Sequence, residues 1–360
     1  MHQTNNGNDR GRQSVAVVLF QLGGPDSPEA IEPFLYNLFS DPDIIDFPLA
    51  RVARPTLARL IASRRAKHVR QHYARIGGRS PIRELTERQA AALEKELRRT
   101  IDARCLVAMR YWNPSTADAV REIQAHRFDQ LVLLPLYPQY SKTTTGSSLN
   151  EWRRQCRATA QDLGQATVIP EFCNHSPYIE AVVEKINLGL EKFRRAGDRS
   201  TVDVHLIFSA HGVPLKEIEQ GDTYQAQIES TMRSVLERGG WPNPHCLCYQ
   251  SRVGPGKWLQ PTLDASLRQL AAQGAERVLV IPISFVTDHV ETLHEIDIEA
   301  RELAEKLGIR QFETMPALND SPTFIRALAD LVTGAVARDQ KSSFKLNSQV
   351  GLVPADGPCR

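Results

Sequence analysis

Two aliphatic runs that end alike constrain the fold of this chain more than any other feature. Residues 131–136 read LVLLPL and residues 278–283 read VLVIPI, and each run follows a stretch with the pattern of a helix. Continuous aliphatic runs of this length are typical of strands buried on both faces, and proline is tolerated only at the end of such a strand. The repetition predicts two similar halves, each built around a buried strand.

Strands alternate with helices along both halves. We expect strands at residues 15–21, 105–109, 131–136, 204–209, 246–250 and 275–285. We expect helices at residues 84–99, 115–126, 261–273 and 324–336. This alternation is typical of βαβ units, whose strands are parallel. The predicted fold class is therefore α/β, with two small parallel sheets, each flanked by helices, facing a central cleft that holds the ligand.

The same pattern predicts the domain organisation. The first α/β domain is expected at residues 15–172, and the second, which carries the metal site, at residues 173–321. A last helix at residues 322–337 is expected to pack back on the first domain. Residues 1–14 and 338–360 are polar, and we expect them to be flexible tails.

Composition excludes several classes of protein. The chain has 360 residues, 41% of them hydrophobic, and a formal net charge of +2, which is too small for a general nucleic-acid-binding surface. No apolar run is long enough to cross a bilayer, and the N-terminus lacks the apolar segment of a signal peptide. The six cysteines are scattered and form no C-x-x-C pair, which favours a reducing cytosol.

His211 follows directly after an apolar, β-branched run at residues 204–210. Gly212 and Pro214 then end the strand. Ligands bind at the carboxyl ends of strands in open α/β sheets, so His211 lies where chemistry is usually done. The alternative is a histidine that only makes local hydrogen bonds at a strand end.

An acidic helix follows the strand that ends near residue 285. Five acids and no Lys or Arg occupy residues 288–299, and Glu291, Glu295 and Glu299 are four residues apart, so they lie along one face. Stacked like charges cost stability unless a cation lies among them, and a divalent metal ion fits this need. The alternative, an acidic N-terminus that the helix dipole favours, explains Asp288 and Glu291 but neither of the other two.

The acidic row also predicts its own backbone geometry. On a strict α-helix, side chains four residues apart are rotated by about 40° around the helix axis from one another. Slight unwinding of the helix aligns them better, and a π-type turn, which is common at functional sites, unwinds the helix in this way. We therefore expect a π-type turn between Glu291 and Glu299. His211 and Glu291 both follow strands of the second half, and neighbouring parallel strands would bring them to one cleft mouth. Thr287 or Asp288 is expected to cap this helix.

A basic segment spans residues 51–75, with eight Arg or Lys and no acid. Leu57, Leu60 and Ile61 are expected to form an apolar stripe on a helix here. A basic amphipathic helix favours a membrane surface or an anionic ligand. The alternative is a solvated helix whose charge is balanced by acids elsewhere.

Two further turns follow strand ends. Residues 22–25 (LGGP) follow the first strand and predict a tight turn close to a ligand, with Ser27 as a helix N-cap and Pro28 as the first helical residue. Residues 137–148 follow the third strand and predict a polar loop rich in hydroxyls, able to hydrogen bond a ligand.

Five motifs together resemble the ferrochelatase family, in order and from about residue 15 to residue 335. They are residues 22–25 (LGGP), 137–141 (YPQYS), 208–214 (FSAHGVP), 250–255 (QSRVGP) and 287–293 (TDHVETL). The resemblance implies insertion of Fe²⁺ into protoporphyrin IX to form protohaem, the final step of haem biosynthesis. It also implies two Rossmann-like domains that clamp the porphyrin between them.

The resemblance assigns expected roles to individual residues. His211 and Glu291 match the essential catalytic pair: His211 would take pyrrole protons or ligate the metal, and Glu291 would ligate or deliver Fe²⁺ or take a proton. Further metal-path and substrate-binding residues are also implied. The metal path would add Asp288, Glu295 and Glu299; substrate binding would involve Leu22, Arg75, Arg110, Tyr137, Ser141, Trp258 and Phe285.

Departures from the family pattern narrow the expected function. Some members carry a C-terminal [2Fe–2S] cluster on several cysteines, but this tail has only Cys359, so no cofactor beyond substrate Fe²⁺ is expected. Coproporphyrin members often have Tyr where this chain has Leu22, which favours protoporphyrin. The alternatives are a coproporphyrin III ferrochelatase, a cobalt or nickel chelatase of the same fold, and a non-catalytic haem or metal carrier. We expect a cytoplasmic protein in peripheral contact with an anionic membrane at its inner face, with no nucleic-acid partner.

Overall fold

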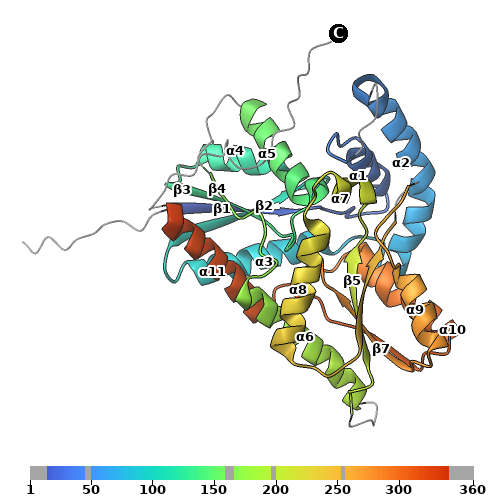
Figure 1. Ribbon diagram of the computed structural model, residues 1–360. Helices are drawn as coiled ribbons and strands as arrows, with labels where there is room; N and C mark the ends of the chain where they lie inside the picture. The colour runs from blue at the N-terminus through green and yellow to red at the C-terminus, as the bar shows by residue number, and fades with distance from the viewer. Residues whose placement is uncertain (1–13, 45–49, 159–165, 196–199, 253–255, 340–360) are drawn as a thin grey trace, which may run out of the picture.

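A computed structural model describes residues 14–44, 50–158, 166–195, 200–252 and 256–339. It contains two four-stranded parallel sheets, one in each half of the chain, with helices on both faces of each (Figure 1). The predicted α/β class and the two similar halves are confirmed. The predicted boundary between domains at residue 172 stays a prediction.

The first sheet has the strand order β2-β1-β3-β4, and all of its neighbouring strands are parallel. Its strands are β1 (Ser14–Gln21), β2 (Asp102–Met109), β3 (Gln130–Pro135) and β4 (Ala166–Val168). Both faces of β1 are buried: Val17 packs toward α3 (Ile82–Leu97), and Val18 packs toward α4 (Thr116–Ala125) and α5 (Ser147–Ala158). This double burial explains why β1 reads as a continuous apolar run rather than an alternating one.

The second sheet repeats this order as β6-β5-β7-β8. Its strands are β5 (His205–His211), β6 (His245–Gln250), β7 (Arg277–Pro282) and β8 (Gln311–Thr314). Phe208 packs on the face covered by α6 (Ser176–Arg195) and α8 (Tyr224–Gly239). Ile207 packs on the face covered by α9 (Leu263–Ala272), η2 (Glu291–Ala300) and α10 (Arg301–Lys306).

One apolar core runs through both halves. It joins Leu19 of β1 and Leu93 of α3 to Phe208 of β5 and Leu279 of β7. Helix α11 (Pro322–Asp339) lies inside this core, where it packs against α3, α6, β3 and β4. The last helix of the chain therefore contacts the first sheet (Figure 1).

A separate small core holds α1 (Ile31–Phe39) against α2 (Ala50–Arg75). Helix α2 buries small side chains, such as Ala58 and Ala62, against α1. Of the three residues of the predicted apolar stripe, Leu57 and Leu60 are 37% and 46% exposed, and Ile61 packs beside this core. The alanine face lets α1 and α2 approach closely, and this leaves the larger side chains on the outer face.

Several predicted boundaries differ from the structure. Ser27 caps a turn by accepting the Ala30 N–H at 3.2 Å, and α1 begins only at Ile31. The polar segment 137–148 is not all loop, because η1 (Lys142–Gly146) and α5 begin within it. The short helix α7 (Leu215–Glu219) follows β5.

The ends of the chain were predicted as tails. Residues 1–13 and 340–360 lie outside the described residues, whereas Ser14 begins β1 and α11 continues to Asp339. In the part of the chain that the structure describes, none of the helices combines the length and the apolar character needed to cross a bilayer.

Candidate active site

His211 and Glu291 form a hydrogen-bonded pair at the carboxyl edge of the second sheet. His211 is the last residue of β5 and Glu291 is the first residue of η2, which follows the neighbouring strand β7. The distance from His211 Nδ1 to Glu291 Oε2 is 2.8 Å. The predicted proximity of the two residues is therefore correct, and it results from the parallel pairing of β5 with β7.

The backbone of His211 is fixed from two sides. Its N–H donates to Ser284 Oγ at 3.0 Å, and its carbonyl accepts the Tyr224 hydroxyl at 3.1 Å. Because the Glu291 carboxylate can only accept a hydrogen bond, Nδ1 carries the proton. The neutral imidazole therefore presents Nε2 as its proton-accepting atom.

The pair shifts both pKa values in the direction that favours charge. Burial alone would lower the pKa of His211, but the charge and hydrogen bond of Glu291 raise it above its usual value, and Glu295 adds to this. Burial would raise the pKa of Glu291, but the charge of His211 and its hydrogen bond hold it below the usual range. His211 is thus a stronger base than an isolated imidazole.

Ser251 joins this pair to the next acid of the row. Its hydroxyl lies 2.9 Å from Glu291 Oε2 and also hydrogen bonds Glu295 Oε2. Ser251 has a φ of 62°, in the left-handed region that favours glycine, and this backbone aims its side chain at the two carboxylates. One hydroxyl carries one proton, so Ser251 can donate to only one carboxylate at a time, and it can accept a hydrogen bond from the other only when that carboxyl group is protonated.

Glu295 is the carboxylate that holds a proton most readily. Burial raises its pKa to about 7, and the negative charge of Glu291 contributes to the shift. A protonated Glu295 can donate to Ser251, which then donates to Glu291, which accepts from His211. The four side chains therefore form a hydrogen-bonded chain along which a proton can pass.

The acidic row lies on a π-helix, as predicted. Helix η2 has π geometry from Glu291 to Ala300. The predicted cap is wrong, because Val290 precedes the helix in a helical conformation and makes no side-chain cap. Asp288 instead accepts the Asn319 amide at 2.9 Å and the Thr292 hydroxyl at 3.0 Å.

The structure does not bring all the predicted metal ligands together. Glu291 and Glu295 share Ser251 near His211, whereas Asp288 is engaged by Asn319. The Glu299 carboxylate lies 3.7 Å from the ring of His294. His211, Glu291 and Glu295 form the compact centre. The predicted roles of Asp288 and Glu299 in a metal path stay predictions.

Two of the predicted ring-binding residues lie beside this centre. The ring of Phe285 is 6.3 Å from that of His211 and nearly perpendicular to it. Trp258 pairs through its backbone with Pro214, just after His211, and its buried indole N–H has no hydrogen-bond partner. Leu22 packs beside the α1–α2 core.

The polar substrate-binding candidates already have protein partners. Arg75 is paired with Glu302 of α10. Arg110 is 10% exposed, and its guanidinium lies 2.8 Å from the buried carboxylate of Asp41. Their predicted contacts with propionates stay predictions.

Ser141 and Tyr137 are enclosed by the fold. Ser141 is buried, caps η1, and donates to Asp222 at 2.9 Å. Burial raises the pKa of Tyr137 well above its usual value, so its phenol stays neutral. Ser141 therefore positions the segment before α5, and its predicted contact with substrate stays a prediction.

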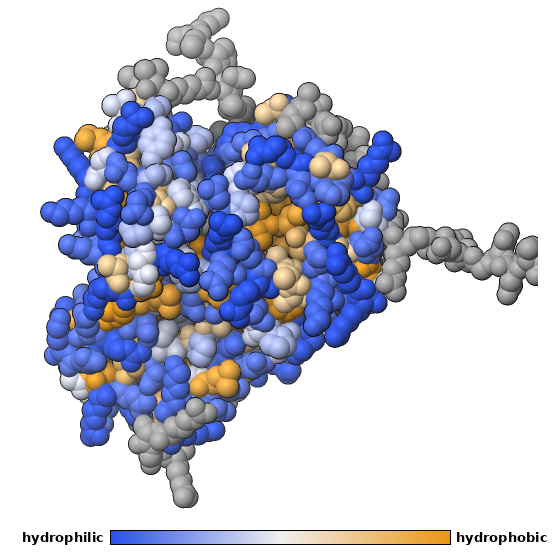
Figure 2. All heavy atoms as spheres, turned by 180° about the vertical axis from the view of Figure 1, so that it is seen from behind, coloured by the Kyte–Doolittle hydropathy of each residue, from blue (hydrophilic) through white to orange (hydrophobic). Residues whose placement is uncertain are grey.

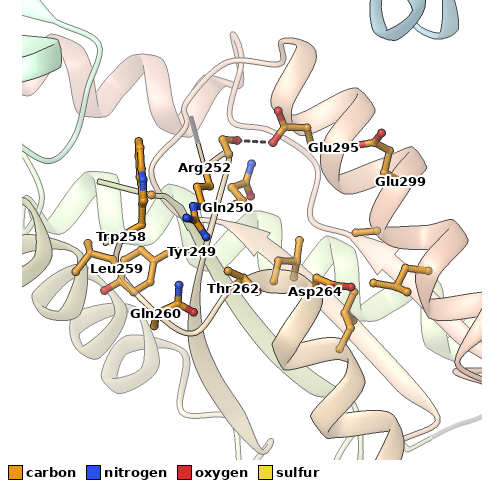
Figure 3. A pocket seen from close by; sticks show the side chains of 16 residues that line it. Tyr249, Gln250, Arg252, Trp258, Leu259, Gln260, Thr262, Asp264, Glu295 and Glu299 are labelled. Carbon is orange, nitrogen blue, oxygen red and sulfur yellow. Dashed lines mark hydrogen bonds between the residues drawn. The ribbon is translucent and has the colours of Figure 1, made fainter. Parts of the chain in front are cut away.

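A cavity of about 370 Å³ opens beside the acidic row, between β6, α9 and η2. Figure 3 shows Glu295 and Glu299 next to one another on η2 at one end of it, with Trp258 and Leu259 at the other. The dashed line in Figure 3 marks the hydrogen bond from Ser251 to Glu295. Because Glu295 lines the cavity together with Ser251 and Glu299, the cavity gives a small polar species access to the outer members of the acidic row.

The described fold and site agree with the comparisons with known proteins. A family model described as Ferrochelatase matches residues 14–336. The chain belongs to the ferrochelatase family. A ferrochelatase of Geotalea daltonii is 47% identical over 320 residues, which cover 89% of this chain and 97% of that protein. A ferrochelatase of Nostoc sp. is 47% identical over 337 residues, which cover 92% of this chain and 84% of that protein.

A solved structure of the same architecture supports the fold alone. SirB from Bacillus subtilis with Fe³⁺ has a TM-score of 0.53 with 10% sequence identity, and the match covers 92% of this chain and 98% of that one.

The ferrochelatase family inserts a metal ion into a porphyrin, so the chain is an enzyme of haem biosynthesis.

Sequence reasoning missed two residues of this ferrochelatase-family site. Ser251 lies in the QSRVGP motif, but its role depends on a left-handed backbone conformation that the sequence does not predict. His289 is buried, and its Nε2 lies 4.0 Å from Glu291 Oε1, which helps to hold the pKa of Glu291 low. A histidine two residues before Glu291, the first acid of the predicted pair, was the available signal.

Proposed function

We propose that this enzyme inserts Fe²⁺ into protoporphyrin IX to form protohaem. The observation that carries the proposal is the chain of His211, Glu291, Ser251 and Glu295 at the edge of the second sheet. Insertion exchanges two pyrrole protons for one Fe²⁺, so the site needs both a base and oxygen donors for the ion. An imidazole and two carboxylates supply these groups, and they suit a borderline divalent ion.

The proton-accepting atom is His211 Nε2, because Nδ1 is held by Glu291. A pyrrole proton passes to Nε2, and the resulting imidazolium is stabilised by the adjacent carboxylate. Glu291 and Glu295 present oxygen atoms to Fe²⁺, and Ser251 can move a proton between them. When Glu295 is ionised, a proton of the imidazolium can pass through Glu291 and Ser251 to the Glu295 carboxylate, and the neutral His211 can then accept the second pyrrole proton.

Substrate positioning is assigned to apolar side chains near His211. Phe285 and Trp258 flank the strand end, and Leu22 lies beside the α1–α2 core. Their apolar surfaces suit the faces of a macrocycle, and pressure on one face would pucker the ring and aim its lone pairs at the metal. Leu22 supports protoporphyrin IX over the more polar coproporphyrin III.

Anaerobic incubation with Fe²⁺ and each porphyrin tests the substrate. We expect absorbance spectra to show repeated turnover with protoporphyrin IX and a higher kcat/KM than with coproporphyrin III. A preference for coproporphyrin III would overturn the assignment from Leu22. A single stoichiometric Soret shift without turnover would indicate a carrier, and turnover only with Co²⁺ or Ni²⁺ and a sirohydrochlorin-like ring would indicate a different chelatase.

We propose that the chain needs no cofactor beyond substrate Fe²⁺. The described cysteines are spread over both halves of the chain, and Cys359 lies outside the described residues; they are Cys105 on β2, Cys156 on α5, Cys173 between β4 and α6, and Cys246 and Cys248 on β6. Iron and acid-labile sulfide analysis of the purified protein tests this proposal, and a stoichiometric amount of both would overturn it.

We propose a cytoplasmic location with peripheral contact between α2 and an anionic membrane. Leu57 and Leu60 are exposed on α2 among Arg59, Arg64 and Arg65. The reverse side of the molecule is mostly hydrophilic, with apolar side chains exposed in a few separate patches (Figure 2). Exposed leucines among arginines are what an interfacial helix uses to bind anionic lipid.

Substituting Arg59, Arg64 and Arg65 by Gln is expected to weaken binding to anionic liposomes on the order of 100-fold at low salt, because each charge near the surface contributes about 1 kcal/mol. The effect should shrink as salt screens the charges. Co-sedimentation measures it. A matched control replaces three exposed arginines elsewhere by Gln. These are Arg121, Arg268 and Arg310.

Equal losses in the two triple variants would mean that only net charge matters. Unchanged binding of the α2 variant at low salt would leave α2 as a solvated helix.

A further inference from the structure

A group of metal-binding side chains lies where α2 meets η2, outside the His211 centre. His72 of α2, His294 of η2 and Glu299 of η2 offer ligand atoms that all lie within 4.8 Å of one another. The rings of His72 and His294 are stacked, with centroids 4.2 Å apart and planes 12° from parallel. A third imidazole, His68, has its Nε2 3.0 Å from that of His72.

His294 is the side chain that points to a missing ligand. It is 1% exposed, and neither of its ring nitrogens has a hydrogen-bond partner. Glu299 Oε2 approaches its Nδ1 only to 3.7 Å, which is too long for a hydrogen bond. A buried polar group without a hydrogen-bond partner destabilises the folded state, and neither nitrogen of His294 finds such a partner in the protein.

The donor set selects the class of ion. Two imidazoles and one carboxylate are typical ligands of Zn²⁺ and of neighbouring transition-metal ions, whereas Mg²⁺ and Ca²⁺ take oxygen ligands. Metal–ligand bonds of about 2.0–2.2 Å place the donors of a tetrahedral site about 3.3 Å apart, so small side-chain rotations would close the present spacing.

We propose that His72, His294 and Glu299 bind a divalent transition-metal ion at a second site, separate from the place where Fe²⁺ is inserted. The ion would join α2, which belongs to the first half of the chain, to η2, which carries the acidic row. It would also engage Glu299, the outer member of that row. The proposal rests on these side chains and holds whichever porphyrin the enzyme uses.

Cobalt binding to the full-length chain carrying His211→Ala tests the proposal, because this background lacks the proposed base of the insertion centre and therefore weakens that centre as a competing metal site. Equilibrium dialysis is expected to find Co²⁺ at the second site, with an absorption spectrum typical of nitrogen ligation. Losing a residue that only supports a metal ligand typically lowers metal affinity by roughly 10- to 100-fold. Adding His294→Phe removes a ligand itself, so it should weaken Co²⁺ binding by more than this. Adding His72→Gln, on the less buried partner, should have the same effect.

His126→Gln is the matched control, because His126 is an exposed histidine that lies beside Glu122, outside this group. It should leave Co²⁺ binding unchanged. Co²⁺ should also raise the melting temperature of the His211→Ala protein, because the ion joins two elements of the folded state, and His294→Phe should abolish this rise. Without metal, His294→Phe should melt no lower than its parent, because an apolar ring replaces an unpartnered polar one.

Equal Co²⁺ affinity with and without His294→Phe would overturn the proposal, and so would equal affinity with and without His72→Gln. Failure of the proposed catalytic function has a different signature, because it would appear as absent porphyrin metallation in the unmodified chain while Co²⁺ still bound at this site.

Discussion

His211→Ala is expected to fold normally and to lower the rate of porphyrin metallation by about 10²- to 10⁴-fold, the range that general base catalysis contributes. The variant removes Nε2, the atom proposed to accept a pyrrole proton. It also leaves Glu291 without the partner that holds its pKa low. Initial rates under anaerobic conditions, measured with saturating Fe²⁺ and protoporphyrin IX, check this result.

His205→Gln is the control for His211→Ala, because His205 begins the same strand at its opposite end. It should retain turnover near that of the unmodified enzyme. Circular dichroism and melting curves of both variants separate a loss of chemistry from a loss of fold. Turnover of the His211→Ala enzyme close to the unmodified rate would remove His211 from the mechanism.

Glu295→Gln is expected to stabilise the metal-free protein at pH 8 and to change its stability much less at pH 5. Burial raises the pKa of Glu295 from 4.5 to about 7, so the folded state holds this proton more tightly than the unfolded state does. The resulting penalty is absent below pH 4.5, grows between pH 4.5 and 7, and is complete above pH 7. Its size is up to about 3 kcal/mol, since each pKa unit is worth about 1.36 kcal/mol.

The same variant should alter the use of iron. Glutamine cannot offer a carboxylate to Fe²⁺, so the Fe²⁺ concentration needed for half-maximal turnover should rise while the KM for porphyrin stays the same. Urea unfolding at pH 5 and pH 8 and kinetics with each substrate varied separately measure both effects. Glu305→Gln, an exposed position on α10, is the control.

If Glu295→Gln destabilises the protein at both pH values and leaves the Fe²⁺ dependence unchanged, the acidic row serves the fold rather than the metal.

The sequence was sufficient to predict the central pair because strand pairing is regular. His211 ends one strand and Glu291 follows the next strand of the same sheet, so parallel pairing alone brings them to one edge. The π-helix was also predictable, because acids repeated every four residues do not stay aligned on an ordinary α-helix.

The rest of the site depends on contacts that the sequence pattern does not encode. Arg110 is paired with Asp41, a distant residue on a turn after α1, and no local signal joins them. His72 and His294 lie on elements from opposite halves of the chain, and only the packing of α2 on η2 brings them together.

The sequence pattern did not show which side of α2 is buried. Alanines at positions 58 and 62 are buried against α1, and Leu57 and Leu60 face solvent. Small residues permit a closer approach of two helices than leucines do, so residue size decided which side of α2 is buried.

The apolar core that passes through both sheets limits how this enzyme can admit a rigid, flat molecule. Moving the two sheets apart would expose Leu93, Phe208 and the residues of α11 that belong to this core. We therefore expect the two sheets to melt together, in a single calorimetric transition. The small core between α1 and α2 is separate from this one, so those two helices can shift at far lower cost. We therefore expect α1 and α2, rather than the two sheets, to move when a flat substrate enters.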